Sequence, residues 1–285
     1  MLIIYAIAAL GLIGLLFGLF LAAAARIFAV ETDPRVEAVK EVLPNVNCGA
    51  CGYAGCVNFA EAVIHGEAPA NGCIPGGDDT TNDIAALLGQ EISESVKLVA
   101  TLFCIGDYYK AADRFIYEGV EDCSVAGVFH GGFKTCSYGC LGLGNCVRAC
   151  PFDAIRMGSH GLPVIYKDKC HGCGLCVKAC PRDLIKILPF SEQGYLVLCS
   201  SQDRGKSVAG ACTVGCIACK ACIKACPQEA ITMEENLAVI DLEKCDDCGE
   251  CVLKCKPGTI HRRSSIPSEE EALAAVVPAK ASESA

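Results

Sequence analysis

The hydrophobic pattern places one long apolar run at the start of the chain. Residues 1–25 carry no charge and are almost entirely apolar, and about 20 such residues cross a bilayer as a helix. The run predicts a single transmembrane anchor over residues 1–26. A cleaved signal peptide is the alternative, but it needs a basic start and a shorter apolar stretch. The basic residues Arg26, Arg35 and Lys40 follow, so we expect a single-pass protein of the cell (inner) membrane with its C-terminal bulk on the cytoplasmic side.

Beyond this run, apolar residues come in short stretches separated by turn residues. Residues 57–67 have the pattern of one short helix, and residues 96–100 that of a strand that follows a helix. Further stretches have the character of short strands, namely 154–157, 163–166, 231–233 and 237–240. The tail from Ser264 is rich in Ser, Glu, Ala and Pro, which favours disorder. The whole pattern predicts an α+β fold.

Cysteine dominates the composition, with 24 of 285 residues, while tryptophan is absent. A disulfide framework would explain this in a small secreted protein. These cysteines repeat as C-x2-C-x2-C, however, which packs the thiols too locally for disulfide pairing. Zinc ribbons use pairs of C-x2-C rather than triplets closed by Cys-Pro. We therefore interpret the cysteines as ligands of iron–sulfur clusters.

Four cysteine runs indicate the type of cluster. Residues 170–181 follow the pattern C-x2-C-x2-C-x3-C-P, the ligand run of bacterial-type ferredoxins with two [4Fe–4S] clusters. Residues 216–227 repeat it in full, and residues 245–255 repeat it except that Lys256 precedes Pro257. The remaining run is irregular and consists of Cys136, Cys140, Cys146, Cys150 and Pro151. These runs predict two tandem 2[4Fe–4S] ferredoxin modules.

The two modules are copies of one repeat unit. Residues 134–141 align with residues 210–217, and a lead-in that ends at Cys104 aligns with one that ends at Cys199. A repeat of this length indicates two structural units of the same design. We expect each unit to begin with a strand-like lead-in.

The last cysteine of each ferredoxin run binds the cluster of the other run. In the first module this rule predicts the sets Cys136, Cys140, Cys146 with Cys180, and Cys150 with Cys170, Cys173, Cys176. In the second module it predicts Cys216, Cys219, Cys222 with Cys255, and Cys226 with Cys245, Cys248, Cys251. The alignment places Leu143 opposite Cys219, so the first module lacks a thiol at that position. Cys136 is the nearest cysteine that can take its place in the set.

A separate site precedes the modules. Its spacing is C-x2-C-x4-C-x16-C, from Cys48, Cys51, Cys56 and Cys73. The glycines between them let the backbone wrap closely around a cluster. Four cysteines also suit zinc, but we assign a [4Fe–4S] cluster here, which makes five in the chain. The cysteines without a motif are Cys104, Cys123, Cys199 and Cys212; we interpret them as buried small apolar residues, with a further metal centre as the alternative.

These features divide the chain into five predicted segments: an anchor at 1–26, an N-terminal [4Fe–4S] domain at 27–90, a lead-in and first ferredoxin module at 91–190, a second module at 191–263 and a disordered tail at 264–285. The formal net charge of −9, made more negative by thiolate-bound clusters, excludes nucleic acid as a partner. The sequence has no P-loop, nucleophile elbow or dinucleotide fingerprint. We predict no substrate-converting site in this chain alone.

Three stretches beyond the uncharged run resemble one family: NCGACGYAGC at 47–56, CIPGG at 73–77 and GCLGLGNCVRACPFDAI at 139–155. They are similar to the B subunit of the Rnf complex, a membrane-bound ferredoxin:NAD+ oxidoreductase coupled to Na+ or H+ translocation. The resemblance covers residues 1–260. It implies an electron-transfer subunit that accepts electrons from reduced ferredoxin and passes them through [4Fe–4S] clusters to membrane, flavin-binding and NAD-binding subunits. Many members have one ferredoxin module, whereas this chain has two.

Soluble ferredoxin is the partner that this resemblance implies, and an acidic ferredoxin needs a basic docking surface. The candidates are Lys178, Arg182, Lys186, Lys220 and Lys224. Two other functions stay open. A membrane-anchored polyferredoxin would serve a hydrogenase or formate dehydrogenase with the same clusters. A corrinoid-protein-like or redox-sensing module would use its first cluster to activate or report rather than to conduct.

Overall fold

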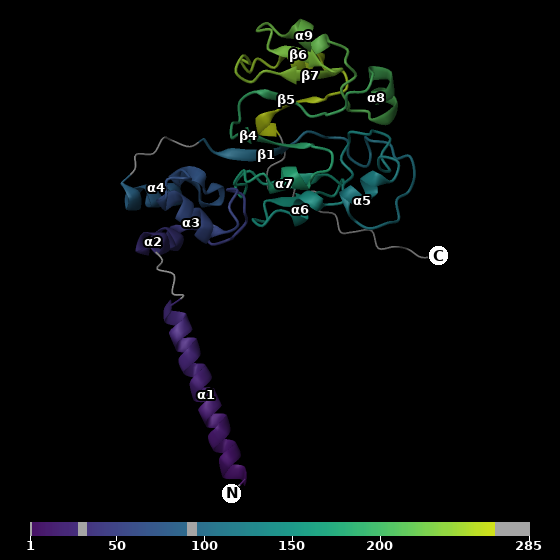
Figure 1. Ribbon diagram of the computed structural model, residues 1–285. Helices are drawn as coiled ribbons and strands as arrows, with labels where there is room; N and C mark the ends of the chain where they lie inside the picture. The colour runs from purple at the N-terminus through teal and green to yellow at the C-terminus, as the bar shows by residue number, and fades with distance from the viewer. Residues whose placement is uncertain (1, 28–32, 90–95, 266–285) are drawn as a thin grey trace.

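The computed structural model describes residues 2–27, 33–89 and 96–265. Helix α1 (Leu2–Ile27) stands apart from the other elements in Figure 1. In these described ranges, no helix qualifies as long and apolar enough to cross a membrane. The predicted anchor therefore stays a prediction. Of the predicted disordered tail, Ser264 and Ser265 lie in the short helix η3 (Arg263–Ser265), and the rest lies outside the described residues.

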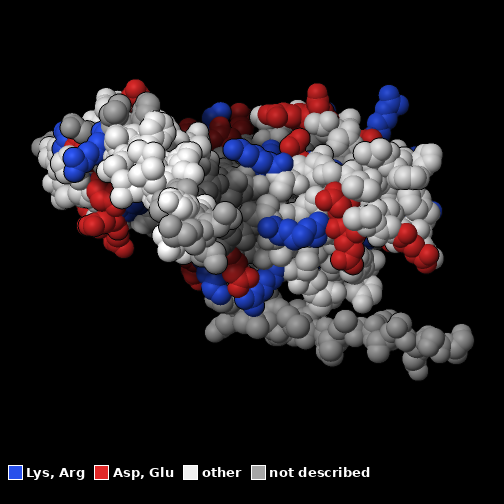
Figure 2. All heavy atoms as spheres, turned by 60° about the horizontal axis from the view of Figure 1, so that its bottom comes forward, with Lys and Arg blue, Asp and Glu red and all other residues white. Residues whose placement is uncertain are grey.

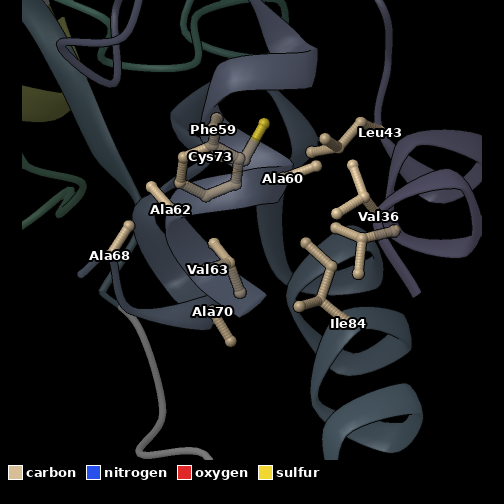
Figure 3. Close-up of a cluster of buried hydrophobic side chains, with 11 residues drawn as sticks. Val36, Leu43, Phe59, Ala60, Ala62, Val63, Ala68, Ala70, Cys73 and Ile84 are labelled. Carbon is tan, nitrogen blue, oxygen red and sulfur yellow. The ribbon is translucent and has the colours of Figure 1, made fainter. Parts of the chain in front are cut away.

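A small helical domain follows α1. Its helices are α2 (Pro34–Val42), α3 (Cys56–Ile64) and α4 (Gly77–Leu88), with the short turns η1 (Ala70–Gly72) and η2 (Ile74–Gly76) before α4. Asp33 caps α2 by accepting the Arg35 N–H, and Pro34 presets the first helical turn. Val36, Phe59 and Ile84 bury their side chains between the three helices (Figure 3). The helix predicted at 57–67 is α3.

The first ferredoxin module is built from two antiparallel strand pairs. Strand β1 (Leu98–Leu102) pairs with β4 (Ile185–Pro189), and β2 (Ile155–Met157) pairs with β3 (Pro163–Ile165). The ligand runs continue into the short helices α6 (Asn145–Arg148) and α7 (Leu175–Ala179). Between β1 and the irregular run lies an additional segment that contains α5 (Cys123–Val128). Val99, Ile155 and Ile185 form the core between the strands.

The second module has the same order of elements. Strand β5 (Tyr195–Val197) pairs with β8 (Ile260–Arg262), and β6 (Ile231–Glu234) pairs with β7 (Leu237–Ile240). Its ligand runs continue into α9 (Ala221–Ala225) and α10 (Glu250–Lys254), and α8 (Gly205–Ala211) occupies the place of the longer segment in the first module. The predicted α+β content and the strand positions are confirmed.

Equivalent backbone hydrogen bonds show that the two modules are copies. The Phe103 N–H donates to the Leu184 carbonyl at 2.7 Å, and the Leu198 N–H donates to the Thr259 carbonyl at 2.9 Å. In both cases the residue just before the lead-in cysteine is tied to the strand that follows the second ligand run. The repeat seen in the sequence is therefore a repeat of structure.

The two modules contact each other through main-chain hydrogen bonds. The Ala112 N–H donates to the Ala211 carbonyl, and the Thr213 N–H donates to the Lys110 carbonyl, both at 2.9 Å. The Ser200 hydroxyl donates to the Phe103 carbonyl at 3.0 Å. These bonds hold the additional segment of the first module against the end of α8. Figure 1 shows the second module stacked on the first at this junction.

Cysteine-lined cavities as candidate cluster sites

All 24 cysteines lie in described residues, and each is a free thiol. The disulfide alternative therefore does not describe this structure. Within the described ranges, no three or more His, Cys, Asp or Glu side chains converge closely enough to hold a single metal ion. The cysteines instead lie around cavities, each lined by several of them.

The N-terminal set lies on one side of the helical domain. Cys48 and Cys51 lie on the loop before α3, Cys56 is the first residue of α3, and Cys73 lies between η1 and η2. The Asn47 side-chain oxygen accepts the Cys56 N–H at 2.9 Å and so fixes the end of the loop. Burial, followed by the charges of the other three cysteines, raises the pKa of Cys73 to about 11. The structure thus brings this predicted set together.

One cavity of the first module is lined by a predicted set as well. Cys150, Cys170, Cys173 and Cys176 line this cavity, which lies between β1 and the start of α7. The Ala100 N–H donates to the Cys170 sulfur at 3.3 Å. Such N–H donors orient a thiolate ligand and stabilise its charge. Cys150 comes from the other ligand run, as the crossover rule predicts.

The second module brings both of its predicted sets together. Cys216, Cys219, Cys222 and Cys255 line one cavity, and the Thr259 N–H donates to the Cys255 sulfur at 3.3 Å. The other set lies at the opposite ends of the same two runs. Burial, then the charges of Cys245 and Cys248, raises the pKa of Cys251 to about 11. The hydrogen bond with Asp246 and burial raise the pKa of Cys248, and the charges of Asp246 and Cys226 add to this shift.

The other cavity of the first module differs from the prediction. The cysteines that line it are Cys123, Cys140, Cys146 and Cys180. Cys136, which the sequence suggested for this set, is not among the residues that line it. The missing thiol comes instead from Cys123, at the start of α5. This corrects the predicted set: Cys123 replaces Cys136.

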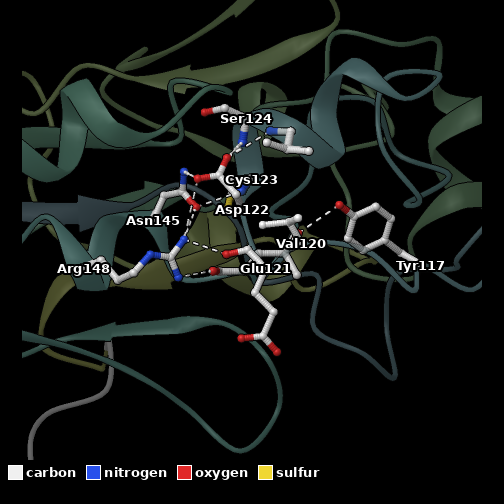
Figure 4. Close-up of polar contacts among 10 residues, drawn as sticks. Tyr117, Val120, Glu121, Asp122, Cys123, Ser124, Asn145 and Arg148 are labelled. Atoms are coloured by element: carbon white, nitrogen blue, oxygen red, sulfur yellow. Dashed lines mark hydrogen bonds and ion pairs between the residues drawn. The ribbon is translucent and has the colours of Figure 1, made fainter.

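A polar network places Cys123 at this cavity (Figure 4). The Asn145 side-chain oxygen accepts the Cys123 N–H at 2.8 Å, and the Asn145 amide donates to Asp122 at 3.0 Å. Arg148 donates to the Glu121 carbonyl and to Asn145, both at 2.7 Å. Asn145 and Arg148 belong to α6, which also carries Cys146. The network therefore ties the start of α5 to the ligand helix.

The cavities suit a cluster better than a zinc ion. A structural zinc ion needs four sulfurs at about 2.3 Å from one point, whereas within the described ranges no three or more His, Cys, Asp or Glu side chains converge on one point. Backbone N–H groups already point at the sulfurs of Cys170, Cys226 and Cys255. Thiolate ligands and N–H···S bonds are the surroundings of [4Fe–4S] clusters. When bound, such a cluster supplies one-electron transfer.

The basic side chains proposed for docking do not all lie on the surface. Lys178, Lys186, Lys220 and Lys224 are exposed, but Arg182 is half-buried. Its guanidinium donates to the carbonyls of Cys136, at 3.1 Å, and of Gly139 and Gly131. Arg182 therefore holds the loop of the irregular run, which corrects its assignment to the docking surface. On the face shown in Figure 2, basic and acidic side chains alternate in small groups.

Three family models match the chain. Residues 43–75 match a family described as "Putative Fe-S cluster", and residues 136–185 and 215–265 match two families described as 4Fe-4S dicluster domains. These ranges contain the N-terminal cysteine set and the paired runs of the two modules. Together with the cavities, they define an iron–sulfur protein that carries [4Fe–4S] clusters.

Comparison with curated proteins gives the family. The B subunit of the proton-translocating ferredoxin:NAD(+) oxidoreductase complex of Clostridium ljungdahlii is 48% identical over 87% of this chain and 88% of that protein. The B subunit of an ion-translocating oxidoreductase complex of Methanosarcina acetivorans is 44% identical over 92% of this chain and 98% of that protein. The B subunit of the Na(+)-translocating ferredoxin:NAD(+) oxidoreductase complex of Acetobacterium woodii is 45% identical over 86% of this chain and 74% of that protein. The chain belongs to the family of B subunits of the ion-translocating (Rnf) oxidoreductase complexes.

Proposed function

We propose that this chain is the electron-transfer subunit of a membrane-bound ferredoxin:NAD+ oxidoreductase whose electron flow is coupled to translocation of Na+ or H+. Its family supports the proposal, because two relatives carry this activity in their names. One of them is named as proton-translocating and the other as Na+-translocating, so the proposal includes either ion. The partners are soluble reduced ferredoxin and the other subunits of the complex, which bind flavin and NAD.

The observation that carries the proposal is the serial order of the cysteine sets. Cys48 of the N-terminal set lies close enough to Cys173 of the first module for its charge to contribute, after burial and its own set, to the raised pKa of Cys173. Cys146 lines one cavity of the first module and Cys176 lines the other. The charge of Cys146 contributes, after burial and the charges of Cys170 and Cys173, to the raised pKa of Cys176. The chain thus brings a cysteine of the N-terminal set near the first module, and the two sets of that module near each other. This order suits conduction better than sensing at one isolated site.

We place α1 in the cell membrane as a single-pass anchor, with the rest of the chain on the cytoplasmic side. The uncharged sequence of residues 1–25 supports this placement, as do exposed large apolar side chains such as Leu10, Phe17 and Phe20. With 26 residues, α1 is about 39 Å long at 1.5 Å per residue, and a bilayer core is about 30 Å thick. The placement goes beyond the finding that no described helix qualifies as a span, and it rests on the sequence and on this exposure.

Reduced ferredoxin, in this proposal, docks on the exposed lysines of the modules. Lys178, Lys186, Lys220 and Lys224 are the exposed members of the predicted basic set. Opposite charge on two partners raises the rate of encounter more than the final affinity, and salt weakens it. Electron transfer from ferredoxin should therefore slow as ionic strength rises.

The test is a Cys51→Ala variant of the chain in the assembled membrane complex. Because Cys51 belongs to the N-terminal set, the variant should lose about four irons per chain and with them ferredoxin-dependent NAD+ reduction. The matched control is Ala50→Ser, next to Cys51, which keeps every thiol and should keep both iron and activity. NAD+ reduction that survives the loss of this cluster would contradict the proposal. In the same membranes, alkaline extraction should leave the wild-type chain in the pellet if α1 is an anchor.

A further inference from the structure

Four cysteines remain outside the sets described so far, and they meet at the junction of the two modules. Cys104 and Cys136 come from the first module, and Cys199 and Cys212 come from the second. All four line one cavity. Each of the three cavities described above is likewise lined by four cysteines. Three of these cysteines had no motif in the sequence, and the fourth, Cys136, is the residue that Cys123 replaces in its predicted set; together they form a further set of four thiols.

The cavity is symmetric with respect to the repeat. Cys104 and Cys199 occupy equivalent positions after the lead-in strands, and each sulfur accepts a backbone N–H at 3.4 Å. The donors are also equivalent, since Cys140 donates to Cys104 and Cys216 donates to Cys199.

The second pair follows the same rule. In each module a glycine N–H donates back to the carbonyl of the cysteine three residues earlier: Gly139 to Cys136 at 3.3 Å, and Gly215 to Cys212 at 3.5 Å. Each module therefore contributes one equivalent pair of thiols in the same backbone setting. Two such pairs that face one cavity make a site with four ligands, which neither module contains alone.

Ordinary apolar packing does not explain these cysteines. A cysteine that only fills an apolar core needs no hydrogen-bond partner, whereas the sulfurs of Cys104 and Cys199 each accept a backbone N–H. The Cys199 sulfur accepts a further N–H, from Ser201 at 3.4 Å, as a thiolate ligand does. Gly106 also leaves room beside the sulfurs, since a Cβ atom there would lie 3.1 Å from the Cys212 sulfur and 3.8 Å from the Cys104 sulfur. These features match those of the other cluster sites.

We propose that Cys104, Cys136, Cys199 and Cys212 bind a sixth [4Fe–4S] cluster that bridges the two modules. Each thiol gives up its proton when it binds iron. The modules are held in place for this by the hydrogen bonds between Ala112 and Ala211 and between Thr213 and Lys110, both beside the site. With this cluster, every cysteine of the chain is a cluster ligand.

The position of the site gives it a role in the order of the clusters. Cys140 lines the cavity of the first module that contains Cys123, and its backbone N–H donates to the bridging Cys104. Cys216 lines a cavity of the second module, and its N–H donates to the bridging Cys199. The proposed site therefore lies between one cavity of each module. It makes the two modules one continuous series with the N-terminal set.

The test is the iron and acid-labile sulfide content of the full chain, reconstituted without oxygen. Six clusters require about 24 irons per chain, whereas five require about 20. The variants Cys104→Ala and Cys199→Ala should each fall to about 20, and the double variant should also stay at about 20, because both cysteines bind the same cluster. The irons that remain also show that each variant is folded.

Two further variants separate the alternatives. Ser200→Ala removes the hydroxyl that donates to the Phe103 carbonyl but keeps every thiol, so it should keep about 24 irons. Combining Cys104→Ala with Cys123→Ala removes ligands of two different sets and should leave about 16. A wild-type content of about 20, a double Cys104/Cys199 variant at about 16, or a Cys104–Cys199 disulfide in the mass spectrum of the reconstituted chain would overturn the proposal. None of these measurements depends on ferredoxin or NAD+, so their failure is distinct from failure of the proposed function.

Discussion

The two ferredoxin modules share their strand pairing and differ in the source of one thiol. In the second module the regular run supplies Cys216, Cys219 and Cys222 to one cavity. In the first module Leu143 stands opposite Cys219, and Cys123 comes from a separate helix to line the equivalent cavity. The number of cysteines around the cavity is the same in both. A ligand set is thus defined by the cavity, and its members need not belong to one run.

The loops that carry these runs follow the same backbone path. Gly142 and Gly144 have left-handed φ angles of 72° and 75°, and their counterparts Ala218 and Lys220 have 54° and 60°. The loops are also equal in length. Leu143 therefore lies in a loop of the same length with left-handed residues at the same two positions, and its side chain packs with Phe133 and Leu141.

The largest expected effect comes from removing Cys123 and restoring the regular run. Cys123→Ala should cost about four irons per chain, because the cavity retains only three thiols. Adding Leu143→Cys to this variant should restore them, since the loop already has the path that presents Cys219 in the second module. Iron content and the cluster EPR signal measure both steps.

Leu143→Ala in the Cys123→Ala background is the matched control for this rescue, because it changes the same side chain without adding a thiol. It should not restore iron. If Cys123→Ala keeps its full iron content, Cys123 is not a ligand and the two modules differ more deeply than we argue. A rescue by Leu143→Ala would show that space, rather than the thiol, was limiting.

The sequence predicts what is local and misses what depends on distant segments. The regular runs, the strands between them and the crossover of Cys150 are fixed by spacing within a few residues. Cys123 is placed by the contacts of Asp122 with Asn145 and Arg148, which no spacing rule encodes. The acidic residue ahead of Cys123 is a helix N-cap signal, but it does not say which cavity the helix faces.

The bridging set was missed for a related reason. The repeat had already aligned Cys104 with Cys199 and showed that Cys212 had a counterpart in Cys136. Each pair on its own is only half of a ligand set, so within one module it resembles a buried apolar pair. The docking of one module against the other makes the set complete, and docking is not visible in the order of residues.

A buried cation in the first module gives the next largest effect. Lys134 is 2% exposed, its ammonium lies 2.8 Å from a carboxylate oxygen of Asp113, and it packs over the ring of Tyr108. Its counterpart in the second module is Gly210. Asp113→Asn leaves the buried charge without its partner and should cost roughly 3–5 kcal/mol, whereas Lys134→Met removes the charge and should cost much less. The temperature at which cluster absorbance is lost should fall by on the order of 10 °C in the first variant.

The prediction depends on the order of the two variants, because Asp113→Asn should lose more stability than Lys134→Met. Asp113 is half-exposed, with 48% of its side chain accessible, so water can solvate it once Lys134 is gone. The ammonium has no hydrogen bond of acceptable geometry within the described residues, so the ion pair is its main compensation. Equal losses in both variants, compared at one heating rate, would mean that Lys134 contributes by packing alone.

The smallest effect concerns the two left-handed positions that begin the ligand helices. Gly144 precedes α6 at φ 75°, and Lys220 precedes α9 at φ 60°. Side chains cost about 1–2 kcal/mol in this conformation. Gly144→Ala should therefore destabilise the first module by about 1 kcal/mol, and Lys220→Gly should stabilise the second by a similar or smaller amount. The same thermal loss of cluster absorbance measures both.

Two controls separate backbone conformation from space and from charge. A Cβ atom at Gly144 would meet nothing nearer than 3.5 Å, so a loss in Gly144→Ala reports the backbone. Gly210 lies inside α8 with open space around it, so Gly210→Ala should stabilise by roughly 0.5–1 kcal/mol. Lys220→Ala keeps a Cβ atom but removes the charge and should change little. If both Gly→Ala variants shift stability in the same direction, the left-handed turns do not limit the ligand loops, and the equal backbone paths of the modules need another cause.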